Sequence, residues 1–179
     1  MFAERGPDGV TIRDLAAEVG VSPMTPYRYF KDKDAILAAV RARAFDRHAD
    51  TLEAAFEASA DTPEVQPAAV GEAYIRFAED HPEAYKLMFD VHQPSAGDYP
   101  DLVRAGERSR RTMTLQLAQD IEAGLPLEEA ELIAHLYWAA LHGPLMLQMS
   151  GMLAPEMSAR TLISALLAAL SEGLGARTI

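Results

Sequence analysis

The side chains best suited to chemistry gather in one short stretch, between residues 22 and 33. Hydroxyl, guanidinium and ammonium groups follow each other closely there, at Thr25, Arg28, Tyr29 and Lys33. Such groups donate hydrogen bonds to phosphate oxygens and to base edges, and arginine forks onto guanine. A plain helical corner needs no exposed Thr-x-Tyr-Arg-Tyr followed by Lys-x-Lys. This stretch therefore suits contact with nucleic acid, and the elements that carry it decide whether DNA is the partner.

The rest of the chain offers little that could catalyse a reaction or hold a metal. Cysteine is absent, and no glycine-rich phosphate loop, G-x-S-x-G or H-E-x-x-H motif occurs. The five histidines lack ligand-like pairing with carboxylates. Glu128, Glu129 and Glu131 suit the positive end of a helix dipole better than acid–base work. We expect no catalytic site, no metal site, no cofactor and no enzymatic activity.

Two helices around a glycine turn must position the polar stretch. Thr11 and Asp14 are spaced as a capping box, which predicts that the first helix begins at Ile12. Gly20 stands where a left-handed residue ends a helix and reverses the chain. The pattern is a helix-turn-helix, a common means of placing a helix in a DNA groove. The apolar face of the first helix is expected to hold Leu15, Ala16 and Val19.

The start of the second helix has two interpretations. Ser22 would cap it with Pro23 at the first position, where a missing N–H costs nothing. Alternatively, Thr25 caps it with Pro26 at the first position, because the Pro26 ring removes the bond back to Ser22. Both starts stay open at this point. In either case, the face toward the first helix is expected to hold Tyr27 and Phe30.

A long linking helix follows this motif. Asp32 is placed to cap it, with Lys33 as its first residue. The positive end of the helix dipole and the lysine make a phosphate a natural neighbour. The buried side is expected to consist of Ile36, Leu37, Val40, Ala44, Phe45, His48, Leu52 and Phe56.

This region resembles the DNA-binding half of the TetR family of transcriptional repressors. The matching strings are T-x-R-D-L-A-x-x-x-G-V-S and T-x-Y-R-Y-F-K-x-K, with departures at Met24, where glycine is frequent, and at Pro26, where an aliphatic residue is usual. The resemblance implies that Thr25 and Arg28 face bases, while Tyr27, Tyr29 and Lys33 hold phosphates. The predicted DNA-binding residues are Arg13, Ser22, Met24, Thr25, Tyr27, Arg28, Tyr29 and Lys33.

The charge distribution agrees with DNA binding only in part. Residues 1–50 hold eight Lys or Arg and eight Asp or Glu, so the remainder carries the whole formal charge of −11. An acidic body that phosphates repel would orient the molecule on DNA. Residues 1–50 nevertheless lack the basic excess of a strong nucleic-acid binder. The prediction therefore depends on the motif.

The chain opens with MFAERG, which resembles only the end of the helix that precedes this motif in the family. Most of that helix is expected to be missing, through trimming, a misassigned start codon or a natural truncation. Together with the neutral charge, this suggests an alternative function: a helical small-molecule-binding or scaffold dimer that has lost DNA binding.

Length and composition predict an all-helical, cytoplasmic protein. Long alternating strand patterns are absent, 49% of the residues are hydrophobic, and there is no cysteine, no cationic leader and no apolar run of membrane-spanning length. We expect a helix-turn-helix domain with its linking helix at 1–50, followed by an effector-binding and dimerisation domain at 51–179. No contact with a membrane is expected.

Helix signals recur through the second part. One stripe holds Val70, Tyr74, Phe77 and Ala78, and His81 with Pro82 ends that helix and starts a short one. A loop is expected at 94–100, and a third helix from about Asp101 to Ala123.

The last two long helices, at 132–149 and 162–170, are apolar nearly all round. A helix that packs only against its own core needs an apolar arc of roughly 100 degrees, so these helices are either central or shared with another subunit. We expect a homodimer through both helices, which would present paired recognition helices to the half-sites of a palindromic operator in double-stranded DNA. The alternative is one central helix in a monomer.

The second part resembles a TetR subgroup named for a Trp-His-Gly signature, through YIRFAEDHPEAYKLMF at 74–89 and WAALHGPLMLQMSG at 138–151. The resemblance implies a cavity for a small-molecule effector, whose binding tilts the linking helix and lowers operator affinity. Pro144 removes a helical bond, and a kink beside Gly143 would leave space. The predicted lining is Phe77, Met88, Phe89, Met113, Tyr137, Trp138, His142, Met146 and Met149.

Overall fold

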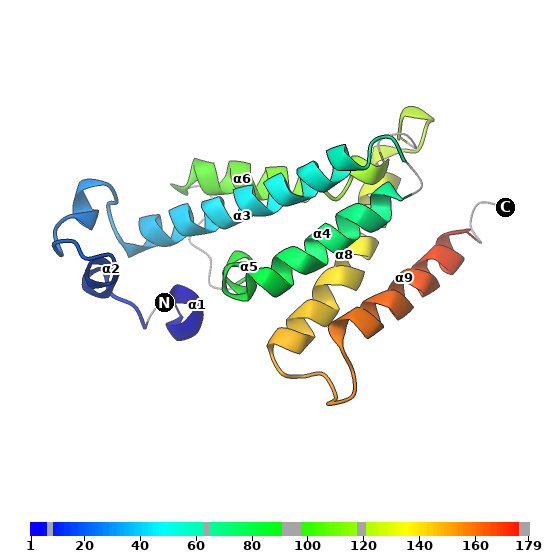
Figure 1. The fold of residues 1–179 in the computed structure, drawn as a ribbon. Helices are drawn as coiled ribbons and strands as arrows, with labels where there is room; N and C mark the ends of the chain where they lie inside the picture. Colours follow the sequence, from blue (N-terminus) through cyan, green and yellow to red (C-terminus); the bar gives the residue numbers. More distant parts are fainter. Residues whose placement is uncertain (7–8, 63–64, 91–97, 118–120, 176–179) are drawn as a thin grey trace. The chain divides into compact units, whose positions relative to one another are not determined.

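The computed structural model describes residues 1–6, 9–62, 65–90, 98–117 and 121–175. Within these ranges the regular elements are all helical and no strand occurs, so the expected fold class is confirmed (Figure 1). The elements are α1 (Phe2–Arg5), α2 (Ile12–Glu18), η1 (Pro26–Arg28), α3 (Lys33–Ala58), α4 (Gln66–Asp80), α5 (Pro82–Met88), α6 (Pro100–Arg111), η3 (Leu115–Leu117), α8 (Leu127–Met149) and α9 (Ala159–Gly175).

Two compact units make up the chain. The first unit consists of Met1–Asp50 and Asp80–Ser109, and the second of Thr51–Glu79 and Arg110–Ile179. The helices α3 and α6 therefore each begin in the first unit and end in the second. The expected functional division at residue 50 stays a prediction. Of the loop expected at 94–100, residues 94–97 lie outside the described part of the chain.

The first helix of the motif forms as its cap residues predict. The Asp14 carboxylate accepts from the Thr11 backbone N–H at 2.9 Å, and the Thr11 hydroxyl accepts from the Asp14 N–H at 3.2 Å. This reciprocal box starts α2 at Ile12. Gly20 has φ 69°, the left-handed conformation that reverses the chain. Val19 was expected on the buried face but is 70% exposed, because α2 has already ended there.

The second element of the motif is shorter than expected. Thr25 precedes Pro26 at the first position, so the second of the two proposed starts is correct, but only a single 3₁₀ turn forms, at Pro26–Arg28. Pro26 has no N–H to donate to the Ser22 carbonyl, so no α-helical turn forms from Ser22. The Ser22 carbonyl instead accepts from the Thr25 N–H at 2.8 Å, and the Pro26 carbonyl accepts from both Tyr29 and Phe30.

The linking helix α3 begins at the predicted residue, but one of its faces is not buried as predicted. The Asp32 carboxylate accepts from the Ala35 N–H at 2.7 Å, and Lys33 is the first helical residue. Val40 was expected inside but is exposed, and Arg41 beside it is fully buried. The Arg41 guanidinium donates to the Met88 carbonyl at 2.8 Å, where α5 ends. A charged side chain thus occupies the place assigned to an apolar one, because it caps the carbonyl end of a helix.

Two hydrophobic clusters form the rest of the first unit's core. One cluster joins α1, α3 and α5, through Phe2, Val10, Leu37 and Leu87. A second joins α3 and α6, through Ala38, Ala42, Leu102 and Ala105. The His48 ring, also fully buried, lies with Nδ1 2.9 Å from the Ser109 hydroxyl. Burial lowers the pKa of His48 from 6.5 to about 4.

The second unit brings together α4, α8 and α9 with the ends of α3 and α6. The helices α8 and α9 pack side by side (Figure 1). The helix expected at 101–123 is wrong in its length, because α6 ends at Arg111. Met113 and Thr114 donate to the carbonyls three residues back, and the Thr114 hydroxyl also bonds the Arg111 carbonyl. These short-range bonds tighten the chain into turns that end the α-helix.

Candidate nucleic-acid interface and ligand cavity

The recognition segment, defined as residues 22–33, presents most of its polar side chains to solvent. Tyr29 is 75% exposed and Tyr27 is 51% exposed, so Tyr27 packs toward α2 less than expected. Of the other predicted DNA-binding residues, Arg13, Ser22, Met24 and Arg28 are exposed, and Thr25 and Lys33 are half-buried. The side chains predicted to meet DNA are thus available to a partner.

The 3₁₀ turn decides which of these side chains share a face. In a 3₁₀ helix, residues three apart lie directly above one another. Thr25, the cap of η1, and Arg28, its last residue, have this spacing. The two side chains to which base contacts were assigned therefore start from the same side of the turn. Tyr27 and Tyr29 flank them from other directions.

The N-terminus of α3 adds a second group of hydrogen-bond donors. Lys33 is its first residue, and the helix dipole favours an anion at this end. The Lys31 ammonium lies 3.9 Å from the Asp32 carboxylate and 5.0 Å from the centre of the Tyr99 ring. Lys31 is therefore held by neighbours within the first unit. Lys33 lies at the N-terminus of α3, the helix end that favours a phosphate group.

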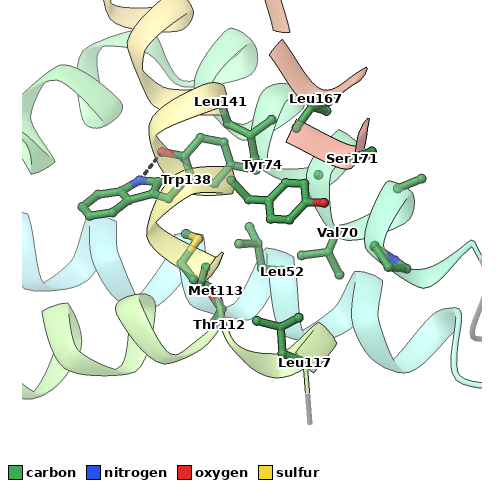
Figure 2. A pocket seen from close by; sticks show the side chains of 15 residues that line it. Leu52, Val70, Tyr74, Thr112, Met113, Leu117, Trp138, Leu141, Leu167 and Ser171 are labelled. Carbon is green, nitrogen blue, oxygen red and sulfur yellow. Dashed lines mark hydrogen bonds between the residues drawn. The ribbon is translucent and has the colours of Figure 1, made fainter. Parts of the chain in front are cut away.

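The second unit contains a partly open cavity of about 370 Å³ (Figure 2). Side chains from five segments far apart in the sequence line it, and they are mostly apolar. The lining consists of Leu52 from α3; Pro67, Ala68, Val70, Gly71 and Tyr74 from α4; Thr112, Met113 and Leu117 after α6; Ala134, Tyr137, Trp138 and Leu141 from α8; and Leu167 and Ser171 from α9. A volume of this size suits a small organic molecule.

One hydrogen-bonded group forms part of the cavity wall. The Trp138 indole N–H donates to the Tyr74 hydroxyl at 2.9 Å (Figure 2). The same hydroxyl lies 3.5 Å from Nδ1 of His142, which is one turn beyond Trp138 on α8. Burial lowers the pKa of His142, which favours a neutral ring. The Tyr74 oxygen is therefore fixed in place while its ring faces the cavity.

Salt bridges join α9 and α4, which form two walls of the cavity. Arg160 at the start of α9 bonds Glu79 of α4 through two N–H groups, each at 2.8 Å. It also bonds Glu72, which lies two turns before Glu79 on α4, at 2.9 and 3.0 Å. Hydrogen bonding to Arg160 lowers the pKa of Glu72. Paired bonds of this kind fix direction as well as distance, so they set where α9 lies along α4.

The structure assembles only part of the predicted cavity lining. Met113, Tyr137 and Trp138 line the cavity, and His142 stands behind Tyr74. Met88 and Phe89 belong to the first unit, where Phe89 packs edge-on against Phe45 and Tyr85. The remaining three, Phe77, Met146 and Met149, lie in the second unit away from this lining.

The position of the cavity along α8 explains these differences. The helix runs through Pro144 to Met149, and Pro144 is buried. The cavity instead borders the preceding two turns, between Ala134 and Leu141. Sequence reasoning missed Tyr74 and Thr112, although Tyr74 stands on a recognised apolar stripe. Nothing in the sequence pattern marked Leu167 or Ser171, because a uniformly apolar α9 does not reveal which side faces a cavity.

Two further features bear on the class of the protein. Among the described residues, no group of three or more His, Cys, Asp or Glu is arranged to hold a metal ion. None of the helices in the described ranges has the length and apolar character needed to cross a bilayer.

Comparison with known families matches both parts of the chain. Residues 1–40 match the family of bacterial regulatory proteins of the tetR family. Residues 67–170, more than half of the chain, match the tetracyclin repressor-like C-terminal domain. The Trp-His-Gly subgroup stays a prediction, because the matched C-terminal family carries no such description.

Individual relatives agree with this result. An uncharacterised HTH-type transcriptional regulator from Mycobacterium tuberculosis is 28% identical over 153 residues, which cover 85% of this chain and 67% of that protein. A solved structure of a protein with unknown function from Rhodococcus sp. RHA1 has a TM-score of 0.77 and 30% identity, covering 96% of this chain and 88% of the other.

The TetR family transcriptional regulator PfmR from Thermus thermophilus shares the fold, with a TM-score of 0.67 and 20% identity over 95% of this chain and 92% of its own. The capping box of α2, the turn at Gly20, the all-helical fold and the two family matches agree with one another. The chain belongs to the TetR family of DNA-binding transcriptional regulators, which are not enzymes.

Proposed function

We propose that the protein is a dimeric repressor that binds a palindromic operator and is released by a small, largely apolar ligand. The observation that carries the proposal is the combination, in one chain, of an exposed polar recognition segment and a largely apolar cavity. An exposed Arg28 and a half-buried Thr25 on one side of a turn suit base edges. An apolar cavity with few polar groups suits a small organic effector.

The proposed contacts with DNA are of two kinds, those that read the base sequence and those that bind the phosphate backbone. Arg28 and Thr25 face base edges and set sequence preference, with Arg28 forked onto guanine. Lys33, Tyr27 and Tyr29 hold phosphates, which fixes register without reading sequence. Arg13, Ser22 and Met24 complete the contact surface. The support for this division is the shared face of Thr25 and Arg28 and the place of Lys33 at a helix N-terminus.

The proposed dimer forms through α8 and α9. Both helices keep large apolar side chains in contact with solvent, at Leu132, Leu147 and Leu166. Burying such surface against a second copy is favourable, and a two-fold axis makes the same patch complementary to itself. Two copies would then present two recognition segments to the two half-sites of an inverted repeat.

Ligand release is proposed to act through continuous helices. Leu52 lines the cavity and belongs to α3, the helix whose first residue is Lys33. Thr112 lines it as well and directly follows α6, which begins in the first unit. A ligand that needs a different spacing of these helix ends favours a different position of the recognition segment. Such a ligand would lower operator affinity by its preference between the two states.

The experiment that tests the proposal is selection of bound duplexes from a randomised DNA pool. We expect an enriched inverted repeat with half-sites about one helical turn apart, or a multiple of it. Light scattering coupled to gel filtration should give the mass of two chains. Recovery of unenriched DNA only, or of the monomer mass throughout, would contradict the proposal. A dimer without DNA selectivity would instead favour a scaffold or small-molecule-binding protein.

A further inference from the structure

The cavity of the second unit is lined by described residues that include no Asp, Glu, Lys or Arg. Its hydrogen-bonding groups are hydroxyls, from Tyr74, Thr112, Tyr137 and Ser171, together with the Trp138 indole. Moving an ionised carboxylate or ammonium into such surroundings without an opposite charge costs several kcal/mol. A neutral oxygen loses much less and is matched by one hydroxyl.

From this lining we infer that the cavity binds an uncharged amphiphile, a chain or ring system with a single alcohol or carbonyl oxygen that meets the Tyr137 hydroxyl. The inference deepens the ligand-regulated function proposed above, because it names the chemical class of the effector. Carboxylates and protonated amines of equal size are rejected. Tyr137 is thereby the residue that determines which polar head is accepted.

Tyr137 is singled out among the hydroxyls by its accessibility. It lines the cavity and is half-buried, whereas Tyr74 and Thr112 in the same wall are fully buried and Ser171 is exposed. The Tyr74 oxygen also accepts from Trp138 at 2.9 Å and lies 3.5 Å from His142, so protein groups already surround it. The contrast makes Tyr74→Phe a matched control for Tyr137→Phe.

Gly71 offers a way to fill the cavity without disturbing the walls. It lies on the stripe of α4 that faces the cavity, between Pro67 and Tyr74. A Cβ built on Gly71 meets no atom within 4 Å. Leucine is also a better helix former than glycine, so Gly71→Leu should fold and occupy the space.

The test is titration of the intact protein with 1-decanol, decanoate and decylammonium, followed by tryptophan emission. Trp138 is the single tryptophan of the chain, so its emission reports directly on the cavity. We expect saturable binding of decanol with a Kd at least about tenfold below that of either ion, corresponding to the penalty for burying a charge. Gly71→Leu should abolish the decanol response while circular dichroism shows an intact helical fold.

The tyrosine variants assign the polar contact. Tyr137→Phe should weaken decanol binding about fivefold, the loss of one neutral hydrogen bond, while Tyr74→Phe changes it less than about twofold. The reverse order of the two variants would overturn the role of Tyr137. Tighter or equal binding of decanoate, decanol binding that survives Gly71→Leu, or no saturable binding by alcohols of any chain length would overturn the ligand class. DNA selection is measured separately, so its failure alone would leave this result standing.

Discussion

The recognition segment and the cavity are built in opposite ways. The recognition segment consists of consecutive residues whose polar side chains are mostly exposed, on a single 3₁₀ turn and the start of one helix. The cavity wall gathers residues from five distant segments, and Tyr74 among them is fully buried. An exposed side chain acts only through its partner, whereas a buried one also supports the fold. Substitutions in the two regions should therefore separate binding from stability.

The largest effect is expected from the same substitution made in both regions. Tyr74→Ala removes a fully buried ring and the acceptor of the Trp138 N–H, which should lower the free energy of unfolding by about 3–5 kcal/mol. Tyr27→Ala, at a side chain that is 51% exposed, should change it by less than about 0.5 kcal/mol. Urea unfolding of both variants measures the difference. Similar losses would break the contrast between the two regions.

This contrast also explains what could be predicted from the sequence. The capping box at Thr11 and Asp14, the left-handed Gly20 and the Asp32 cap depend on residues three or four apart, and the structure confirms all of them. The cavity depends on contacts between residues such as Leu52 and Leu167, which no local spacing records. Local patterns therefore predicted the caps and the turn on either side of Pro26–Arg28 better than they predicted the cavity lining.

Errors within the motif have a related physical cause. Pro26 shifted the start of the second element because it has no N–H for the Ser22 carbonyl, and the end of that element after a single 3₁₀ turn was not predicted. Arg41 was not expected inside, since amphipathic patterns assign charged residues to the surface. Its place depends on the carbonyl end of α5, a contact between residues 41 and 88 that sequence spacing does not contain.

His48 extends the contrast between buried and exposed residues to the first unit, where it is a fully buried titratable group in the same unit as the recognition segment. Its pKa of about 4 lies below the ordinary 6.5 because burial disfavours the charged ring. Between these values the unfolded chain takes up a proton that the folded chain does not, so stability falls as the pH falls from 6.5 toward 4. The full loss from this group is about 3 kcal/mol.

Urea unfolding across this pH window measures the effect of His48. His48→Gln should flatten the loss of stability on acidification, even if it lowers stability at neutral pH. His135→Gln, at an exposed histidine, is the control and should leave the loss unchanged. A parallel pH profile for His48→Gln and the unmodified protein would show that His48 is accessible to protons in the folded state.

On the recognition segment, two substitutions should affect DNA binding differently and leave stability unchanged. Arg28→Ala should cost about 1–3 kcal/mol on the selected operator and relax the preference at one base pair. Lys33→Ala should weaken binding to every sequence and reduce the slope of log K against log salt by about one. Fluorescence anisotropy with matched and scrambled duplexes over a range of salt separates these outcomes. Equal behaviour of the two variants would contradict the division of roles.

The smallest effect is expected where an exposed contact supports the cavity. Arg160 makes four hydrogen bonds to Glu72 and Glu79, yet its side chain is 46% exposed and that of Glu79 is 34% exposed. Water and salt screen such pairs, so a double-mutant cycle with Arg160→Gln and Glu79→Gln should give a coupling of about 1 kcal/mol that shrinks with added salt.

Arg110 and Glu131 provide the control for this cycle within the same unit, since a single bond of 3.4 Å joins them. Their coupling should be nearer to zero, because one long contact between mobile side chains gains little over water. If both pairs gave the same small value, the paired geometry of Arg160 would contribute nothing to holding α9 on α4. The wall formed by Leu167 and Ser171 would then depend on apolar packing alone, and the closure of the cavity would not respond to salt.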